Sequence, residues 1–133
     1  DIFIVARATS KQAESRLLRI GVNRVAMPAY IGGYHMATMA MRPSVVDFLD
    51  LLTDGKRDEL QIEELFIEND NTFVGQKVFD HFGSHRGTVA LLAMRRKGQH
   101  GFLRPTGTTQ IELGDQLILM GTTHQLDRLL RRT

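Results

Sequence analysis

The chain has 133 residues, of which 42% are hydrophobic and 24% charged, a balance typical of a folded globular protein and not of a disordered segment. It contains no cysteine, which excludes disulfides, thiol nucleophiles and cysteine-bound zinc. Seventeen basic against fifteen acidic side chains leave a formal charge of +2. The basic residues are dispersed and not interleaved with aromatic ones, so nucleic acid is not an expected partner.

The chain opens with an apolar run, Ile2 to Val5, that is typical of a strand buried on both faces of a parallel sheet. Thr9 and Gln12 have the spacing of a capping box, which predicts a helix that ends at Gly21. A second strand is expected in VNRVAMP, ending at Pro28. Because strand, helix and strand in this order form a parallel βαβ unit, residues 1–30 are expected to be the tail of a larger α/β sheet.

Residues 31–55 are expected to form two helices joined at Pro43, because proline interrupts helical hydrogen bonding. The second helix is predicted to begin with a capping box formed by Ser44 and Asp47. We expect apolar residues of both helices to form an interface between two chains, with Pro43 as its hinge. The predicted interface residues are Gly33, Met36, Ala37, Ala40, Met41 and Phe48.

Residues 56–133 are expected to form a compact α+β module after the polar break at Asp54–Gly55. Strands are predicted in LQIEELFIE and VALLAMRR, and on both sides of a Gly114–Asp115 turn, with a short edge segment in FLRP. A short helix is expected within VGQKVFDHFG. Thr122 and Gln125 have the spacing of a capping box at the start of a final helix.

Few residues indicate a metal site. His81 and His85 have the spacing of two ligands on one helical face, but the intervening Gly83 favours a surface loop. Asp47, Asp50 and Asp54 carry oxygens suited to calcium, although a solvated helix face is the better interpretation. No metal site is therefore expected.

Few residues indicate other chemistry. Gly32–Gly33 lacks the spacing of a phosphate-binding loop, and a tight helix start with close packing explains it better. No serine lies in a nucleophile elbow, so an enzyme is not expected. Arg7 ends the first strand, where ligands of open α/β sheets bind. It is a candidate for an anionic ligand, and the alternative is a surface arginine paired with a nearby acid.

Taken in order, these parts resemble the RCK domain, the regulator of potassium conductance, also called the Trk-type or KTN domain. The segment IVARATSKQAESRLLRIGVNRVAMP is similar to the last strand, helix and strand of its Rossmann-like first lobe. YIGGYHMATMAMRPSVVDFLD is similar to its crossover helix pair. The sequence from Leu60 onward, above all GDQLILMG, is similar to its C-terminal lobe.

The resemblance implies an α/β part followed by an α+β part. These are the tail of a Rossmann-like parallel sheet, a bent crossover helix pair, and a small α+β C-terminal lobe. It also implies that this sequence is a fragment, whose missing front carries the glycine-rich nucleotide loop and the ribose-binding acid.

The functional implication is a ligand-sensing regulatory domain at the cytoplasmic face of the cell membrane, from a prokaryotic potassium channel. Such domains form homodimers that assemble into octameric gating rings and act on a potassium pore. The alternatives are a regulatory subunit of a Trk or Ktr potassium transporter or of a cation antiporter. A fragment of an NAD-dependent oxidoreductase is less favoured, because no residue is a convincing catalytic acid or base.

The resemblance does not identify which ligand this domain binds. Family members bind NAD, ATP or ADP, or Ca²⁺, and the main nucleotide loop is absent from these residues. In calcium-gated relatives acidic ligands alternate along the first strand. The matching positions here are Arg7 and Thr9, so that calcium site is not reproduced and Arg7 suits an anionic ligand. Some C-terminal lobes bind a cyclic dinucleotide, for which only a loose placement of Arg86 is found.

Overall fold

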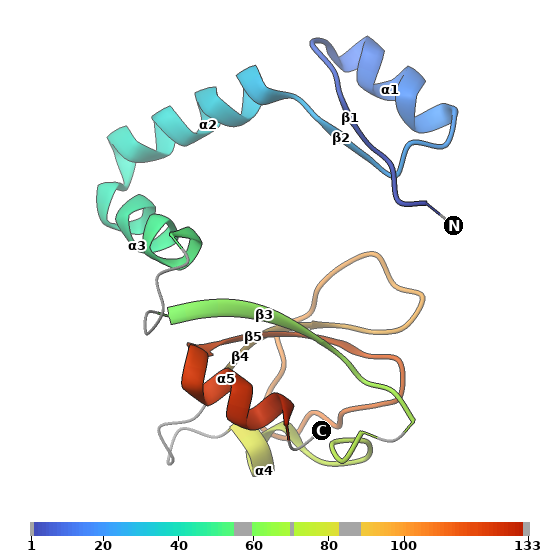
Figure 1. Ribbon diagram of the computed structural model, residues 1–133, viewed down its shortest axis with the longest axis vertical. Helices are drawn as coiled ribbons and strands as arrows, with labels where there is room; N and C mark the ends of the chain where they lie inside the picture. The colour runs from blue at the N-terminus through green and yellow to red at the C-terminus, as the bar shows by residue number, and fades with distance from the viewer. Residues whose placement is uncertain (1, 55–59, 70, 83–88, 132–133) are drawn as a thin grey trace. The chain divides into compact units, whose positions relative to one another are not determined.

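The computed structural model describes residues 2–54, 60–69, 71–82 and 89–131 (Figure 1). The chain divides into two compact units, Asp1–Asp50 and Leu51–Thr133, and each is described by itself. Within the described residues, no helix combines the length and the apolar composition that a bilayer span requires.

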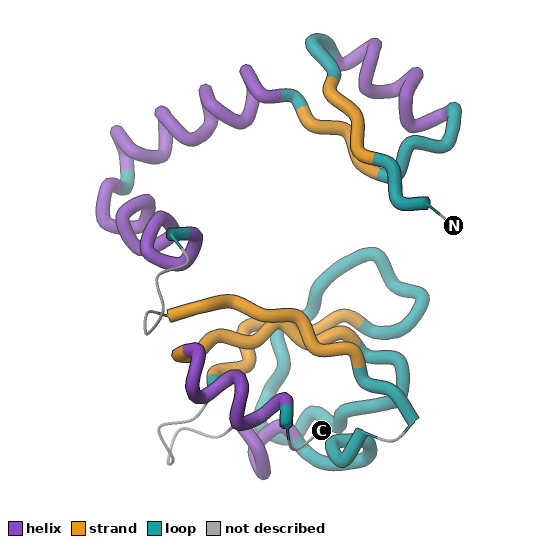
Figure 2. The backbone as a smooth tube through the Cα atoms, in the orientation of Figure 1, coloured by secondary structure: helices purple, strands orange, loops and turns teal. Residues whose placement is uncertain are grey.

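Two parallel strands joined by a helix begin the first unit (Figure 2). β1 (Val5–Arg7) pairs with β2 (Arg24–Ala26), and α1 (Lys11–Arg19) connects them. The register places Ala6 opposite Val25. The predicted strand, helix and strand are thereby confirmed.

The predicted start of α1 is wrong by one residue. Ser10, and not Thr9, caps the helix, because the Ser10 side chain accepts a hydrogen bond from the N–H of Ala13 at 3.2 Å. The reason lies in the preceding strand. The N–H of Ala8 still donates to the carbonyl of Ala26, so Thr9 is needed as the link between strand and helix.

The predicted end of α1 is confirmed. Gly21 has φ +97°, a conformation that residues with a side chain rarely adopt. Its N–H donates to the carbonyl of Leu18, and the N–H of Val22 donates to the carbonyl of Leu17. These two bonds form a Schellman motif, which satisfies carbonyls at the end of the helix.

The opening apolar run is not buried in the described chain. Ile2, Phe3 and Val5 are 86%, 67% and 63% exposed. In the described residues β1 has β2 as its single strand neighbour, and two strands with one helix do not surround it. The expectation of a strand covered on both faces is therefore wrong for this chain by itself.

Two helices follow, α2 (Pro28–Met41) and α3 (Pro43–Thr53), as predicted. Pro28 begins α2 and does not end the second strand, because its fixed φ and missing N–H suit the first helical position. Likewise Pro43 begins α3, and Ser44 already lies inside the helix. The capping box predicted for Ser44 and Asp47 is therefore wrong.

The second unit contains a three-stranded antiparallel sheet in the order β3-β5-β4, with two helices (Figure 1). The strands are β3 (Leu60–Phe66), β4 (Ala90–Arg95) and β5 (Gln116–Thr122), and the helices are α4 (Val78–Phe82) and α5 (Thr123–Leu130). These elements confirm the predicted α+β module.

Three details of this unit test the predictions. The capping box of α5 is confirmed, because the Thr122 side chain accepts from the N–H of Gln125 and the Gln125 side chain accepts from the N–H of Thr122. FLRP is confirmed as a short edge segment, bridged to β4 between Leu103 and Met94. The strand predicted before Gly114 is wrong, because that stretch makes only an isolated bridge at Gln110.

The core of the second unit lies on one side of its sheet. Leu65, Leu117 and Met94 are aligned across the three strands, and all are buried. Leu126 of α5 and Val78 of α4 belong to the same cluster, so these helices cover this face. Among the residues that the structure describes, this cluster consists of Leu65, Ile67, Phe73, Val78, Val89, Met94, Ile111, Leu117, Leu119 and Leu126.

Candidate functional site

Arg7 lies exposed at the carboxyl end of β1, as the sequence predicts. The chain then enters α1 at Lys11, whose ammonium lies 3.1 Å from Glu14 Oε2 and 5.4 Å from the centre of the Tyr30 ring in α2. This contact brings the first turn of α2 beside the first turn of α1. In the described part of the chain Arg7 makes no ion pair, so its guanidinium is free to meet an anion.

The predicted interface residues all lie on exposed parts of α2 and α3. Met36 and Met41 are 70% and 78% exposed, and Phe48 of α3 is 43% exposed. α2 buries none of its residues. Sequence analysis missed further exposed apolar residues on α2, which are Tyr30, Ile31, Tyr34 and Met39. The available signal was that α2 is apolar on all sides, which is typical of a helix that is surrounded by other elements.

The close packing expected at Gly32–Gly33 is absent from the described structure. Both glycines lie within α2, and no atom lies within 4 Å of where a Cβ would be placed on either. Small residues on an exposed helix leave the backbone accessible to a partner. This arrangement is compatible with an interface and not with packing inside the unit.

The hinge predicted at Pro43 coincides with a break in the helical backbone. Arg42 separates α2 from α3 and has a non-helical conformation, with φ −145° and ψ 63°. Its N–H donates to the carbonyl of Thr38, and its carbonyl accepts from the N–H groups of Val45 and Val46. One residue therefore ends the first helix and begins the second.

A buried ion pair fixes the end of the second unit that the Gly114–Asp115 turn occupies. Asp115 is 1% exposed, and its Oδ2 accepts from Arg96 Nη1 at 2.6 Å and from the N–H of Glu112 at 2.8 Å. Arg96 Nη2 also donates to the carbonyl of Gln110 at 3.1 Å. Sequence analysis found the turn but missed its basic partner, since Arg96 was one of three adjacent basic residues.

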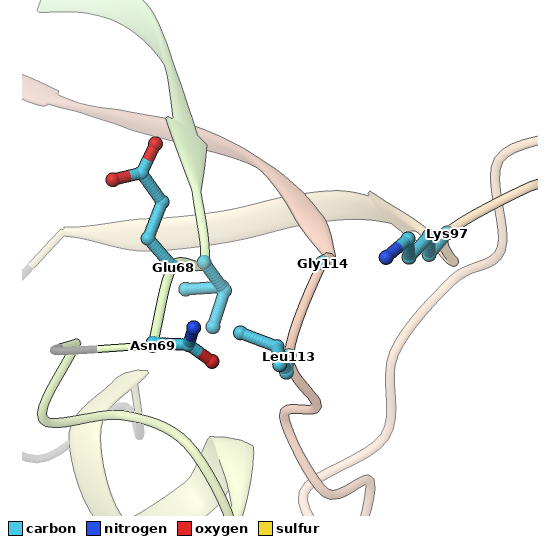
Figure 3. Close-up of a pocket in the computed structure, with 6 residues that line it drawn as sticks. Glu68, Asn69, Lys97, Leu113 and Gly114 are labelled. Atoms are coloured by element: carbon cyan, nitrogen blue, oxygen red, sulfur yellow. The ribbon is translucent and has the colours of Figure 1, made fainter.

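An open pocket of about 430 Å³ lies beside this turn (Figure 3). It is lined by residues that follow β3, follow β4 and precede β5, which are Ile67, Glu68, Asn69, Lys97, Leu113 and Gly114. The Lys97 side chain lies against Gly114, where a Cβ would stand 2.7 Å from the lysine Cδ. The lining therefore combines one acid, Glu68, and one base, Lys97, with the apolar side chains of Ile67 and Leu113.

The candidate metal ligands are not brought together. His81 lies in α4, half-buried, with its ring centre 4.8 Å from that of Phe73, so the predicted surface loop is wrong for this residue. His85 and Arg86 lie outside the described residues. Across the ranges that the structure describes, no three His, Asp or Glu side chains are grouped to hold a metal ion, Asp47, Asp50 and Asp54 included.

Comparison with known proteins gives the family. The TrkA-C domain family matches residues 62–133. Potassium channel protein 1 and probable potassium channel protein 2 of Methanocaldococcus jannaschii are each 28% identical, over 131 and 133 residues. These matches cover 98% and 97% of this chain but 38% of each relative, so the chain spans less than half of their length.

A solved structure supports the same assignment. The RCK C domain of the potassium transport protein KtrA, in complex with cyclic diadenosine monophosphate, is 26% identical with a TM-score of 0.53. The match covers 68% of this chain and 98% of that domain. The antiparallel sheet with its helices is therefore an RCK C-terminal fold, and through residues 62–133 the chain belongs to the TrkA-C domain family.

Proposed function

We propose that this chain belongs to the ligand-sensing regulatory domain of a potassium channel, at the cytoplasmic face of the membrane. The observation that carries the proposal is the match of nearly the whole chain, and not of the TrkA-C domain alone, to two potassium channel proteins. The first unit and the helix pair thus occur together with the TrkA-C domain in those channels.

The exposed helix pair suits a role in assembly. A helix of 14 residues without a buried side chain exposes more apolar surface than a solvated helix normally does. A two-fold pairing through the same surface of each chain is the commonest way to cover it. In the proposed mechanism the homodimer is the unit of an octameric ring that pulls on the pore.

The break at Arg42 and Pro43 is the proposed moving part. Helical hydrogen bonding is interrupted there, so a change in the angle between α2 and α3 breaks few bonds. A ligand that binds one angle more tightly than another shifts the population toward it. Ligand binding and pore opening are coupled through this shift.

An anionic nucleotide is the ligand class that we propose for the complete domain. Arg7 is exposed at a strand end and has no acidic partner in the described residues, and the related KtrA domain is in complex with a cyclic dinucleotide. NAD, ATP and ADP share the required phosphate chemistry. Calcium is not favoured, because the described residues contain no cluster of acidic ligands.

A regulatory subunit of a Trk- or Ktr-type transporter is the second candidate. It is favoured by the likeness to the KtrA domain, which this chain covers almost completely. In that case the pore is a separate protein and not part of the same polypeptide. Catalysis is not proposed for this chain.

A chimera tests the channel proposal. This chain replaces the matching 131 residues of Potassium channel protein 1, and potassium flux is measured in liposomes with and without NAD, ATP or ADP. We expect potassium flux through the chimera to change when nucleotide is added.

Variants of the chimera test the helix pair. Met36→Asp with Met41→Asp should remove the response to nucleotide and leave potassium conduction. Gln12→Asp with Ser15→Asp adds the same charge to exposed positions of α1 and should change neither property. Nucleotide-independent flux in every chimera contradicts the proposal.

A further inference from the structure

The pocket beside the Gly114–Asp115 turn lies on backbone that is held in place without a ligand. The N–H of Ile67 donates to the carbonyl of Asp115 at 2.9 Å, and the N–H of Gly114 donates to the carbonyl of Ile67 at 2.8 Å. Arg96, which precedes the lining residue Lys97, is joined to Asp115 by the ion pair of 2.6 Å. The three segments that line the pocket are therefore connected to one another, and a site formed in advance loses less freedom when it binds a ligand.

The left-handed backbone of Gly114 makes room for the Lys97 side chain. Gly114 has φ +87°, and a Cβ on it would stand 2.7 Å from the lysine Cδ. The methylene stem of Lys97 therefore lies directly against the glycine backbone. Figure 3 shows the lysine ammonium on the side that faces Gly114, so the pocket lining includes a positive charge.

Three polar side chains of the lining have no partner among the described residues. They are Glu68, Asn69 and Lys97, and within the described ranges none of these side chains makes an ion pair or a hydrogen bond. The neighbouring base is different, because Arg96 already pairs with the carboxylate of Asp115. An acid and a base of the lining are thus both available to a ligand.

We propose that this pocket binds a small zwitterion with an apolar part, which is the chemistry of a free aliphatic amino acid. Lys97 pairs with the carboxylate of the ligand and Glu68 with its ammonium group, from opposite sides of Leu113 (Figure 3). Leu113 is 47% exposed and offers apolar surface to the side chain of the ligand. The Asn69 amide can donate to the carboxylate or accept from the ammonium group. The volume of about 430 Å³ lies within the range of ordinary small-molecule sites.

Ligands with one kind of charge match the lining less well. A phosphate or another anion attracted by Lys97 would meet the like charge of Glu68, and a simple cation would meet the like charge of Lys97. A metal ion is not indicated either, because the described residues contain no group of three ligating His, Asp or Glu side chains. This inference goes beyond the proposed function, because it concerns the second unit and a different ligand from the nucleotide expected at Arg7.

Titration with leucine tests the site in the intact chain. In heteronuclear NMR spectra of the amide groups, we expect the signals of Asn69, Leu113 and Gly114 to shift and to saturate with a dissociation constant of about 1 mM. The signal of Arg7 should stay in place. Absence of saturable shifts at the pocket up to about 50 mM leucine overturns the inference. The response of the chimera to nucleotide is measured separately, so failure here leaves the proposed function intact.

Two fragments of leucine test recognition of both charges. Isocaproate lacks the ammonium group and isoamylamine lacks the carboxylate, and each keeps the apolar side chain. Each should bind about tenfold more weakly than leucine, because one charged residue of the pocket is left without a partner. Equal affinity for all three ligands means that the pocket binds through its apolar surface alone, and overturns the inference.

Two variants assign the charges to their residues. Glu68→Gln should weaken leucine binding about tenfold and isocaproate binding not at all, since isocaproate has no ammonium group to lose a partner. Lys97→Met keeps the stem that lies against Gly114, and it should weaken the binding of leucine but not of isoamylamine. Equal weakening of all three ligands by one variant overturns the assignment of that residue.

Matched controls change the same charges outside the pocket. Glu63→Gln and Lys77→Met alter exposed residues that do not line it, and both should bind leucine as the unchanged chain does. The same NMR spectra report whether each variant is folded. If a pocket variant does not fold, the comparison of leucine with its two fragments in the unchanged chain still decides. A control that loses as much leucine affinity as Glu68→Gln or Lys97→Met overturns the inference.

Discussion

Arg96 Nη1 lies 2.6 Å from Asp115 Oδ2, and this ion pair joins the end of β4 to the start of β5. Asp115 is almost fully buried, while the Arg96 side chain is 23% exposed. The carboxylate also accepts from the N–H of Glu112, so it holds the turn and the neighbouring strand end together. Loss of either partner leaves a polar group or a charge uncompensated.

Asp115→Ala should therefore lower the free energy of unfolding by about 3 kcal/mol, the usual effect of breaking a buried pair. Arg96→Ala should have a similar effect, because it leaves the buried carboxylate unpaired. The double variant should be destabilised by less than the sum of the two. Urea denaturation measures all three.

Glu112→Ala is the control for this cycle. The Glu112 carboxylate lies 3.5 Å from Arg96 Nη1 but is 66% exposed, so its removal should cost less than about 1 kcal/mol. A Glu112→Ala variant as unstable as Asp115→Ala would show that the exposed acid, and not the buried one, stabilises this turn.

Thr122→Ala should lower the free energy of unfolding by about 1 kcal/mol, because the Thr122 side chain caps α5. Thr122→Ser keeps the hydroxyl and should recover most of the loss. Thermal denaturation compares the three proteins. Equal stability of the alanine and serine variants means that the cap contributes nothing measurable.

NAD and ATP should bind this chain weakly or not at all, since its residues include no glycine-rich phosphate loop. Titration calorimetry should give dissociation constants no tighter than about 1 mM. Arg7→Ala should remove any residual binding, whereas Arg24→Ala, at the amino end of β2, should leave it. Micromolar binding that survives Arg7→Ala places the nucleotide site elsewhere.

The exposed helix pair makes a prediction about association. Met36→Asp with Met41→Asp should give folded monomers in analytical ultracentrifugation, because each substitution would bury an unpaired charge at the helix interface. A double variant that stays dimeric and equally stable shows that the contact lies elsewhere.

The two units should differ in independent stability. The buried apolar residues of the first unit are Ala8 and Val46, whereas those of the second form one cluster around Leu117 and Leu119. A fragment of residues 1–42 should unfold without a cooperative transition, and one of residues 60–133 should unfold cooperatively. Cooperative melting of the shorter fragment as a monomer contradicts this expectation.

Local signals in the sequence predicted most elements because each has a chemical marker. Gly21 marks the end of α1, and Thr122 with Gln125 marks the start of α5, as the hydrogen bonds show. The errors occur where a longer-range contact decides. Strand pairing extends to Ala8 and moves the cap to Ser10, which no pattern around Thr9 reveals.

The candidate site could also be predicted only in part, because some of its contacts join residues that are far apart in the sequence. Exposure of Met36 and Met41 follows from a helix with more apolar surface than one unit can bury. The partner of Asp115 could not be predicted, because Arg96 and Asp115 are 19 positions apart and the intervening segment contains a turn and an edge segment. Sequence spacing does not fix which of three adjacent basic side chains reaches the carboxylate.

The single residue between α2 and α3 gives the helix pair the geometry of a lever. α2 has 14 residues and is therefore about 21 Å long, so a rotation of about 10° at Arg42 displaces its far end by about 4 Å. The far end is the turn at Pro28 to Tyr30, where Lys11 contacts the Tyr30 ring. A small torsional change at Arg42 thus produces a displacement of several ångströms at the first turn of α2, which follows Ala26, the β2 residue paired with Arg7.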